Sequence, residues 1–227
     1  MTRNLAVFDV DGTLVDSRAL IHRAAREGAQ AVGMPEPAYD AVRQIVGLSL
    51  KPALSELAPD LDEQGLDRFV EAFQESFRRM HAEPGYVEPL YEGAAELLDR
   101  LKSGGWTIAM ATGNSRRGVN RLLQMHGWAD LFDTTHCADD GPGKPHPAML
   151  IEAMRATGVD PRRTVMIGDT AHDMRMAINA GVRPQGVSWG FHTAEEVRAS
   201  GADHVAHSFA ELQQALDAFA LARSIPA

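Results

Sequence analysis

Cysteine is almost missing from this chain of 227 residues, in which Cys137 is the only one. A single cysteine excludes an intramolecular disulfide and suits a reducing compartment. Long apolar runs are missing too, because no stretch approaches the roughly 18 residues that a membrane helix requires. Residues 1–4 also lack the apolar segment of a secretion signal. We therefore expect a cytoplasmic protein without a membrane partner.

Positive charge is in short supply, with 22 Lys and Arg against 31 Asp and Glu and a net charge of −9. Nucleic acids call for a basic face, so a nucleic-acid partner is not expected. A small anionic substrate remains compatible, since local charge can oppose the net charge. Lysine is the scarcest basic residue, present only as Lys51, Lys102 and Lys144. No motif specifies an oligomeric state.

The periodicity of the chain indicates its fold class. Residues 5–8 are apolar throughout, which is typical of a buried parallel strand. From residue 93 onward, helical and strand patterns alternate, which predicts a doubly wound parallel α/β sheet with helices on both faces. The predicted helices cover residues 93–102, 115–126, 146–157, 174–180 and 210–222. The predicted strands cover residues 106–111, 132–136, 164–167, 185–188 and 204–206.

An all-helical segment interrupts this pattern directly after the first strand. Its predicted helices cover residues 17–32, 39–45, 50–57 and 66–81. The last is amphipathic, with Phe69, Phe73 and Phe77 at a spacing that indicates core positions. We expect an α/β core domain of residues 1–16 and 86–227, and an inserted helical domain of residues 17–85. Segments 17–20 and 83–89 are the expected hinges.

Two carboxylates follow the first predicted strand. Asp9 and Asp11 lie two residues apart on an extended chain, so both leave on the same side. Two like charges held that close repel by roughly 4 kcal/mol at an effective dielectric constant of 20. A metal ion or a lysine must compensate them, unless the segment is an ordinary Asp-Gly turn after a strand.

Polar residues also follow three later segments. Thr112 and Gly113 precede a predicted helix, where a hydroxyl and backbone N–H groups suit an anion, although this segment taken alone favours a plain helix N-cap with a glycine turn. Lys144 lies in a loop rich in Pro and Gly, which restrains the side chain as a charge-neutralising role requires, and an ordinary surface lysine in a turn is the alternative. Asp169 ends a predicted strand, and Asp173 follows in the first helical turn, where a charge also stabilises the helix dipole.

These residues meet in one crevice, because ligand sites in open α/β sheets lie beyond the carboxyl ends of the strands. Four carboxylates against one lysine leave a charge of about −3, which requires a divalent cation. All-oxygen ligands suit Mg²⁺, which also binds phosphate oxygens. The sequence therefore predicts a Mg²⁺ site.

The four segments together resemble the four-motif signature of the haloacid dehalogenase-like hydrolase superfamily, in order and across nearly the whole chain. The inserted helices resemble the cap of its phosphoglycolate phosphatase and β-phosphoglucomutase branch. The resemblance implies a Mg²⁺-dependent phosphatase that hydrolyses a small phosphorylated metabolite, such as phosphoglycolate, through an aspartyl-phosphate.

The resemblance also implies roles for the residues of the catalytic centre. Asp9 would be the nucleophile, and Asp11 the general acid and then the general base. Thr112 and the N–H of Gly113 would bind the phosphoryl oxygens, and Lys144 would neutralise their charge. Dehalogenases of the superfamily lack an acid/base carboxylate at the position of Asp11, which favours phosphate chemistry.

The implied metal ligands are Asp9, the carbonyl of Val10 and Asp169. Asp173 would bind a metal-bound water or orient Lys144.

Substrate selection is expected in the cap. Lys51, together with Arg43, is our hypothesis for binding a second anionic group such as a carboxylate, and a solvated lysine is the alternative. The related phosphonoacetaldehyde hydrolase forms a Schiff base on a lysine of its cap, and Lys51 could do the same. The rest of that enzyme's cap pattern is not found in this sequence. Residues 189–192 follow a predicted strand and are expected near the same end of the sheet, where they either contact the substrate or only pack.

Two other functions compete with the phosphatase. A β-phosphoglucomutase-like enzyme acting on a sugar phosphate would use the same core motifs. A non-enzymatic phospho-acceptor switch would use a similar set of Asp, Thr and Lys residues, but such domains run to about 120 residues without an inserted cap.

Overall fold

A six-stranded sheet, parallel throughout, organises the protein, for which a computed structural model describes residues 3–222. The strand order is β3-β2-β1-β4-β5-β6, which places β1 at the centre. The prediction of a doubly wound parallel α/β fold is confirmed. The strands are β1 (Leu5–Phe8), β2 (Thr107–Ala111), β3 (Thr134–His136), β4 (Thr164–Gly168), β5 (Arg183–Val187) and β6 (His204–Ala206).

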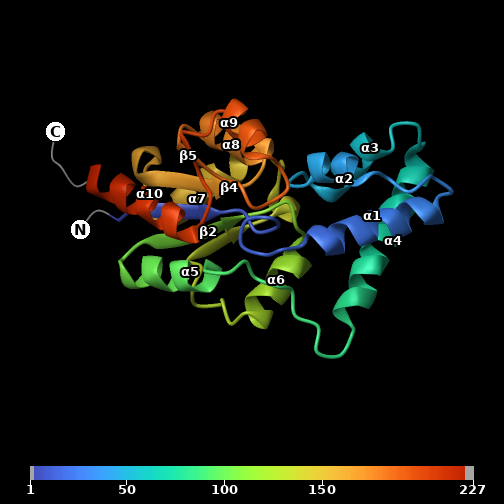
Figure 1. Cartoon of the computed structure of the whole chain (residues 1–227), viewed down its shortest axis with the longest axis horizontal. Coiled ribbons are helices and arrows are strands. Elements are labelled where there is room, and N and C mark those ends of the chain that lie inside the picture. The colour runs from blue at the N-terminus through green and yellow to red at the C-terminus, as the bar shows by residue number, and fades with distance from the viewer. Residues whose placement is uncertain (1–2, 223–227) are drawn as a thin grey trace.

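Two hydrophobic clusters cover the two faces of the sheet. Residues of β1 alternate between them, with Ala6 and Phe8 in one cluster and Leu5 and Val7 in the other, as a strand buried on both faces requires. Figure 1 shows the helices arranged around the sheet. The first face carries α5 (Ala94–Ser103), α6 (Arg116–Met125) and α10 (Phe209–Ala222). The second carries α7 (Ala148–Thr157) and α8 (Ala171–Ala180), with α9 (Ala194–Ala199) packed beside β5 and β6.

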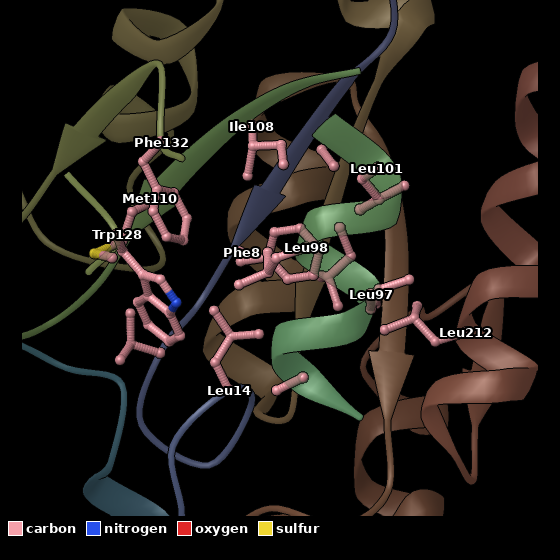
Figure 2. Packing of buried hydrophobic residues seen from close by; sticks show 14 of the residues in the cluster. Phe8, Leu14, Leu97, Leu98, Leu101, Ile108, Met110, Trp128, Phe132 and Leu212 are labelled. Carbon is pink, nitrogen blue, oxygen red and sulfur yellow. The ribbon is translucent and has the colours of Figure 1, made fainter. Parts of the chain in front are cut away.

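The larger cluster is built around β1, β2 and α5. Figure 2 shows Phe8 of β1 facing Leu98 of α5, with Ile108 of β2 and Leu101 of α5 beside them. Phe8, Leu98 and Ile108 are fully buried. This packing holds β1 rigidly, so the residues that follow Phe8 begin from a fixed point.

The inserted helices form a hydrophobic cluster of their own, and we refer to them as the cap. They are α1 (Arg18–Ala31), α2 (Tyr39–Ile45), α3 (Leu50–Leu57) and α4 (Glu63–His81). In Figure 1 they extend beyond one end of the sheet. Helices α1 and α4 approach closely because position 28 is glycine, where a Cβ would lie 2.6 Å from the Phe69 ring. The expected domain boundaries stay a prediction.

The predicted phenylalanine stripe of α4 is in the cap cluster, with Phe69 and Phe73 buried and Phe77 packed against it. Phe73 and Phe77 also line a cavity that the spacing did not reveal.

Among the described residues, no helix is both long enough and apolar enough to span a bilayer.

Helix starts are where the predictions from sequence differ most from the structure. Helix α4 begins at Glu63 rather than residue 66, because the Asp62 side chain accepts a hydrogen bond from the Gly65 N–H. Helix α8 begins at residue 171 rather than 174, behind the N-cap Thr170. Helix α9 was not predicted at all.

Candidate active site

The described structure brings five predicted residues to one end of the sheet. Asp9 follows β1, Thr112 follows β2, and Asp169 follows β4. Lys144 lies in the loop before α7, and Asp173 in the first turn of α8. All five side chains are buried. The site forms because parallel strands end at the same edge.

Three of these carboxylates form a tight cluster with one ammonium group. Oxygens of Asp9, Asp169 and Asp173 all lie within 4.8 Å of one another. The Lys144 Nζ donates to Asp9 Oδ1 at 2.5 Å and to Asp173 Oδ1 at 2.6 Å. Both ion pairs are almost fully withdrawn from solvent. Lys144 therefore neutralises about one of three negative charges.

Asp169 is held by groups that the sequence did not single out. The Thr13 hydroxyl donates to Asp169 Oδ1 at 2.9 Å, and the Phe191 N–H donates to Oδ2 at 2.7 Å. Two glycines make room for this carboxylate. A Cβ at Gly12, whose φ is +89°, would lie 2.3 Å from Oδ2, and one at Gly190 would lie 2.1 Å from it. The orientation of Asp169 thus depends on backbone that has no side chain.

Asp173 is fixed by the start of its own helix. Its Oδ2 accepts from the Thr170 hydroxyl at 2.7 Å and from the Thr170 N–H at 3.1 Å. The Asp173 N–H in turn donates to the Thr170 hydroxyl oxygen at 3.4 Å, which completes a capping box. Oδ2 therefore caps the N-terminus of α8, while Oδ1 accepts from the Lys144 ammonium.

The pKa values reflect the crowding of charge. Burial raises the pKa of Asp9 well above its ordinary value, against the opposing attraction of Lys144. Burial, and then the Asp173 carboxylate, raise the pKa of Asp169 to about 7. Burial alone would lower the pKa of Lys144, but the carboxylates of Asp173 and Asp9 outweigh it and raise that pKa. The three carboxylates are an all-oxygen donor set with excess negative charge, which fits a hard divalent cation such as Mg²⁺.

Asp11 lies apart from the acidic cluster and lines the neighbouring cavity. Burial, followed by the charge of Glu88, raises the pKa of Asp11 to about 6. Such a group exists in both protonation states near neutral pH, as a general acid and base requires. Glu88 is itself buried, and nothing in the sequence marked it.

Thr112 and Gly113 lie where the cap meets the sheet. The Thr112 side chain is buried, and its Oγ1 accepts from the Asn114 N–H at 3.1 Å. A Cβ at Gly113 would lie 2.6 Å from the Leu48 carbonyl oxygen of the cap. Only a glycine permits this close approach.

A cavity of about 470 Å³ opens beside Asp9 and Asp11. Lys51 lines it, but the Lys51 ammonium donates to Asp67 at 2.6 Å. Arg43 does not line it. The Arg43 guanidinium instead donates to both carboxylate oxygens of Glu196, at 2.7 and 3.2 Å, linking α2 of the cap to α9. The structure therefore does not bring Arg43 and Lys51 to a common anion site.

Residues 189–192 pack rather than line the cavity. The Trp189 indole N–H donates to the Thr13 carbonyl at 3.0 Å, and its ring stacks on Phe209. Because the Phe191 N–H also donates to Asp169, this segment contacts both the motif that follows β1 and the carboxylate that follows β4.

Comparison with known proteins shows the family of this chain. The sequence profile of the haloacid dehalogenase-like hydrolases matches residues 6–187. The chain therefore belongs to the haloacid dehalogenase-like hydrolase family, and the resemblance seen in its motifs is confirmed.

Several relatives align over nearly the full chain. The probable phosphatase IndB of Dickeya dadantii is 35% identical over 226 residues, covering 98% of this chain and 97% of that protein. A phosphoglycolate phosphatase of Vibrio vulnificus is 32% identical over 220 residues, covering 92% and 93%. The crystal structure of CbbY from Rhodobacter sphaeroides, in complex with xylulose-(1,5)bisphosphate, is similar with a TM-score of 0.79 at 29% identity, covering 93% and 96%.

Replacing Lys144 with methionine should destabilise the metal-free protein. Lys144→Met leaves the buried carboxylates of Asp9 and Asp173 without their cation, which costs about 3–5 kcal/mol. Urea denaturation measures this free energy of unfolding. The matched control is Lys102→Met, because the ion pair of Lys102 with Asp133 is partly exposed, and its loss should cost about 1 kcal/mol or less. Equal effects of the two substitutions would contradict the buried ion-pair assignment.

The metal-free protein should also lose stability as the pH rises. The folded-state pKa of Asp169, about 7, lies above its ordinary value of 3.8. Its contribution to stability is therefore present at low pH and lost as the pH rises through about 7. Urea denaturation at about pH 5 and about pH 8 measures this change. Asp169→Asn should flatten the dependence, and added Mg²⁺ should stabilise the wild type most at the higher pH. An unchanged slope in Asp169→Asn would refute this origin.

Proposed function

We propose that this protein is a Mg²⁺-dependent phosphatase that hydrolyses a small phosphorylated metabolite through an aspartyl-phosphate. The observation that carries the proposal is Asp9, buried at the end of β1, with Lys144 at 2.5 Å and Asp169 and Asp173 beside it. Phosphatase relatives over nearly the whole chain support it. A cytoplasmic location remains our prediction.

In the first half-reaction, an Asp9 oxygen forms a bond to phosphorus while the ester P–O bond breaks. The leaving alkoxide takes the proton of Asp11. Thr112 and the Gly113 N–H bind the phosphoryl oxygens, and Lys144 offsets their charge.

In the second half-reaction, water attacks the phosphorus of the aspartyl-phosphate. Asp11, now a carboxylate, takes a proton from that water, and the bond between Asp9 and phosphorus breaks to release inorganic phosphate. The metal would be held by Asp9 and Asp169, with Asp173 nearby, and when bound it supplies positive charge for the phosphoryl group. The Val10 carbonyl, which the resemblance implied as a further ligand, instead accepts from the backbone N–H groups of Thr13, Leu14 and Val15. Phosphoryl transfer depends mainly on such positioning and charge neutralisation.

Asp9→Asn should abolish the activity. The amide cannot attack phosphorus, so we expect kcat/KM to fall on the order of 10⁴-fold or more. A phosphate-release assay over a panel of phosphomonoesters that includes phosphoglycolate, with Mg²⁺, measures it. Asp130→Asn is the control, because Asp130 is exposed and its loss should leave kcat/KM within about twofold. Substantial turnover by Asp9→Asn would disprove the nucleophile.

A sugar-phosphate mutase is the second candidate, because the cavity of about 470 Å³ exceeds the needs of a two-carbon acid. Incubation with β-glucose 1-phosphate and Mg²⁺ separates the two. We expect free phosphate and glucose, because the phosphatase relatives support hydrolysis. Glucose 6-phosphate as the main product would establish the mutase. A phosphoprotein that persists for hours without product would instead indicate a phospho-acceptor switch.

A further inference from the structure

The cavity beside Asp9 runs between the cap and α6, and its two walls differ in chemistry. The cap wall is largely apolar, with Ile21 of α1 and Val70, Phe73 and Phe77 of α4. Such a surface contributes to binding by removing apolar ligand surface from water. A ligand that contained only polar groups would leave this wall unused.

The opposite wall belongs to α6 and carries two arginines. Arg117 and Arg121 lie four residues apart on this helix, so both occupy the same face, and both line the cavity. Gly118, the residue after Arg117, also lines the cavity, and a Cβ there would lie 2.1 Å from the Asn114 side chain. Helix α6 therefore contributes two guanidinium groups to this wall of the cavity.

The other cations of the cavity already have partners. Lys51 donates to Asp67 at 2.6 Å, and Arg78 pairs with Glu75 at 2.7 Å. Arg117 forms no ion pair with a carboxylate of the described residues. Arg121 comes no nearer than 3.6 Å to Glu88, and its buried Nε has no hydrogen-bond partner among the groups described. Among the cations of the cavity, the two arginines of α6 thus have the fewest close partners in the described structure, because Arg121 has only the longer ion pair with Glu88.

We propose that the protein selects phosphomonoesters whose alcohol combines an apolar body with a second anionic group, and that Arg117 and Arg121 bind that anion. This inference rests on the proposed phosphatase function. The phosphoryl group lies at Asp9, the apolar body packs on Phe73 and Phe77, and the distal anion reaches α6. The anion site is therefore on the core domain, whereas Lys51 lies on the cap.

The dimensions agree with a substrate of this kind. A volume of about 470 Å³ falls within the range of pockets that bury ligands much larger than a two-carbon acid. Arginine is suited to a carboxylate or phosphate, because its planar fork forms two parallel hydrogen bonds. An anion there would also satisfy the buried Nε of Arg121.

A matched pair of substrates tests the anion site. Para-carboxymethylphenyl phosphate has an aromatic body and a distal carboxylate, and its carboxamide has the same shape without the charge. The methylene group insulates the ring, so the two leaving groups are similar. The wild type with Mg²⁺ should hydrolyse the acid with a kcat/KM about tenfold or more above that of the amide, the value of a charged hydrogen bond. Phosphoglycolate is the third substrate.

The variants are Arg117→Gln, Arg121→Gln and the double variant. Each should lower kcat/KM for the acid, mainly by raising KM, and leave the amide within about twofold. Arg100→Gln of α5 and Arg68→Gln of α4 are controls, because both arginines are exposed and neither lines the cavity. The preference for acid over amide should vanish in the double variant only.

The outcomes separate this inference from the proposed function. Hydrolysis of the amide and of phosphoglycolate without any preference for the acid would overturn the anion site alone. Equal losses on acid and amide in the α6 variants, or a loss of the preference in Lys51→Ala but not in the double variant, would also overturn it. No phosphate release from any ester would overturn the phosphatase, and this inference with it.

Discussion

The contact of the Lys144 ammonium with Asp9 and Asp173 is the interaction on which the rest of the site depends. It places a buried cation between two carboxylates that would otherwise repel each other at close range. A buried charge is tolerated only when it is paired, and here each partner is fixed independently. Asp9 follows a strand whose two faces are both packed, and Asp173 closes the start of α8. The fold thus keeps these charged side chains close together, although each would be better hydrated if it were exposed.

One ammonium group does not balance three carboxylates, so the cluster keeps an excess of negative charge. The excess negative charge makes the site receptive to a divalent cation. The acidic residues of the site differ in their position relative to the cavity. Asp9 and Asp11 line the cavity, whereas Asp169 and Asp173 do not. Glycines at positions 12 and 190 give Asp169 its space, so the acidic cluster is shaped as much by missing side chains as by those present.

The sequence predicted the parts that follow from strand order and failed where folding brings distant surfaces together. Asp9, Thr112 and Asp169 could be placed at one edge because each follows a parallel strand. The pairing of Arg43 with Glu196 could not be anticipated, since Glu196 lies 153 residues away on a helix that was not predicted. Thr193 and Glu196 do carry the spacing of a capping box, so that helix had a signal. The Phe191 N–H on Asp169 had none, because a backbone group leaves no trace in a pattern of side chains.

The Glu196 carboxylate both caps α9 and contacts α2 of the cap. Its side chain accepts from the Thr193 N–H at 2.7 Å and completes the capping box of α9, and the same carboxylate accepts from Arg43 and from Gln44 of the cap. Separation of the cap from the core would free the carboxylate from α2 while its bond to Thr193 persists. Arg43 is likewise held within α2, where its Nε donates to Asp40 at 2.9 Å. The contact between α2 and α9 therefore joins two groups that are each positioned on their own side, which lowers its entropic cost.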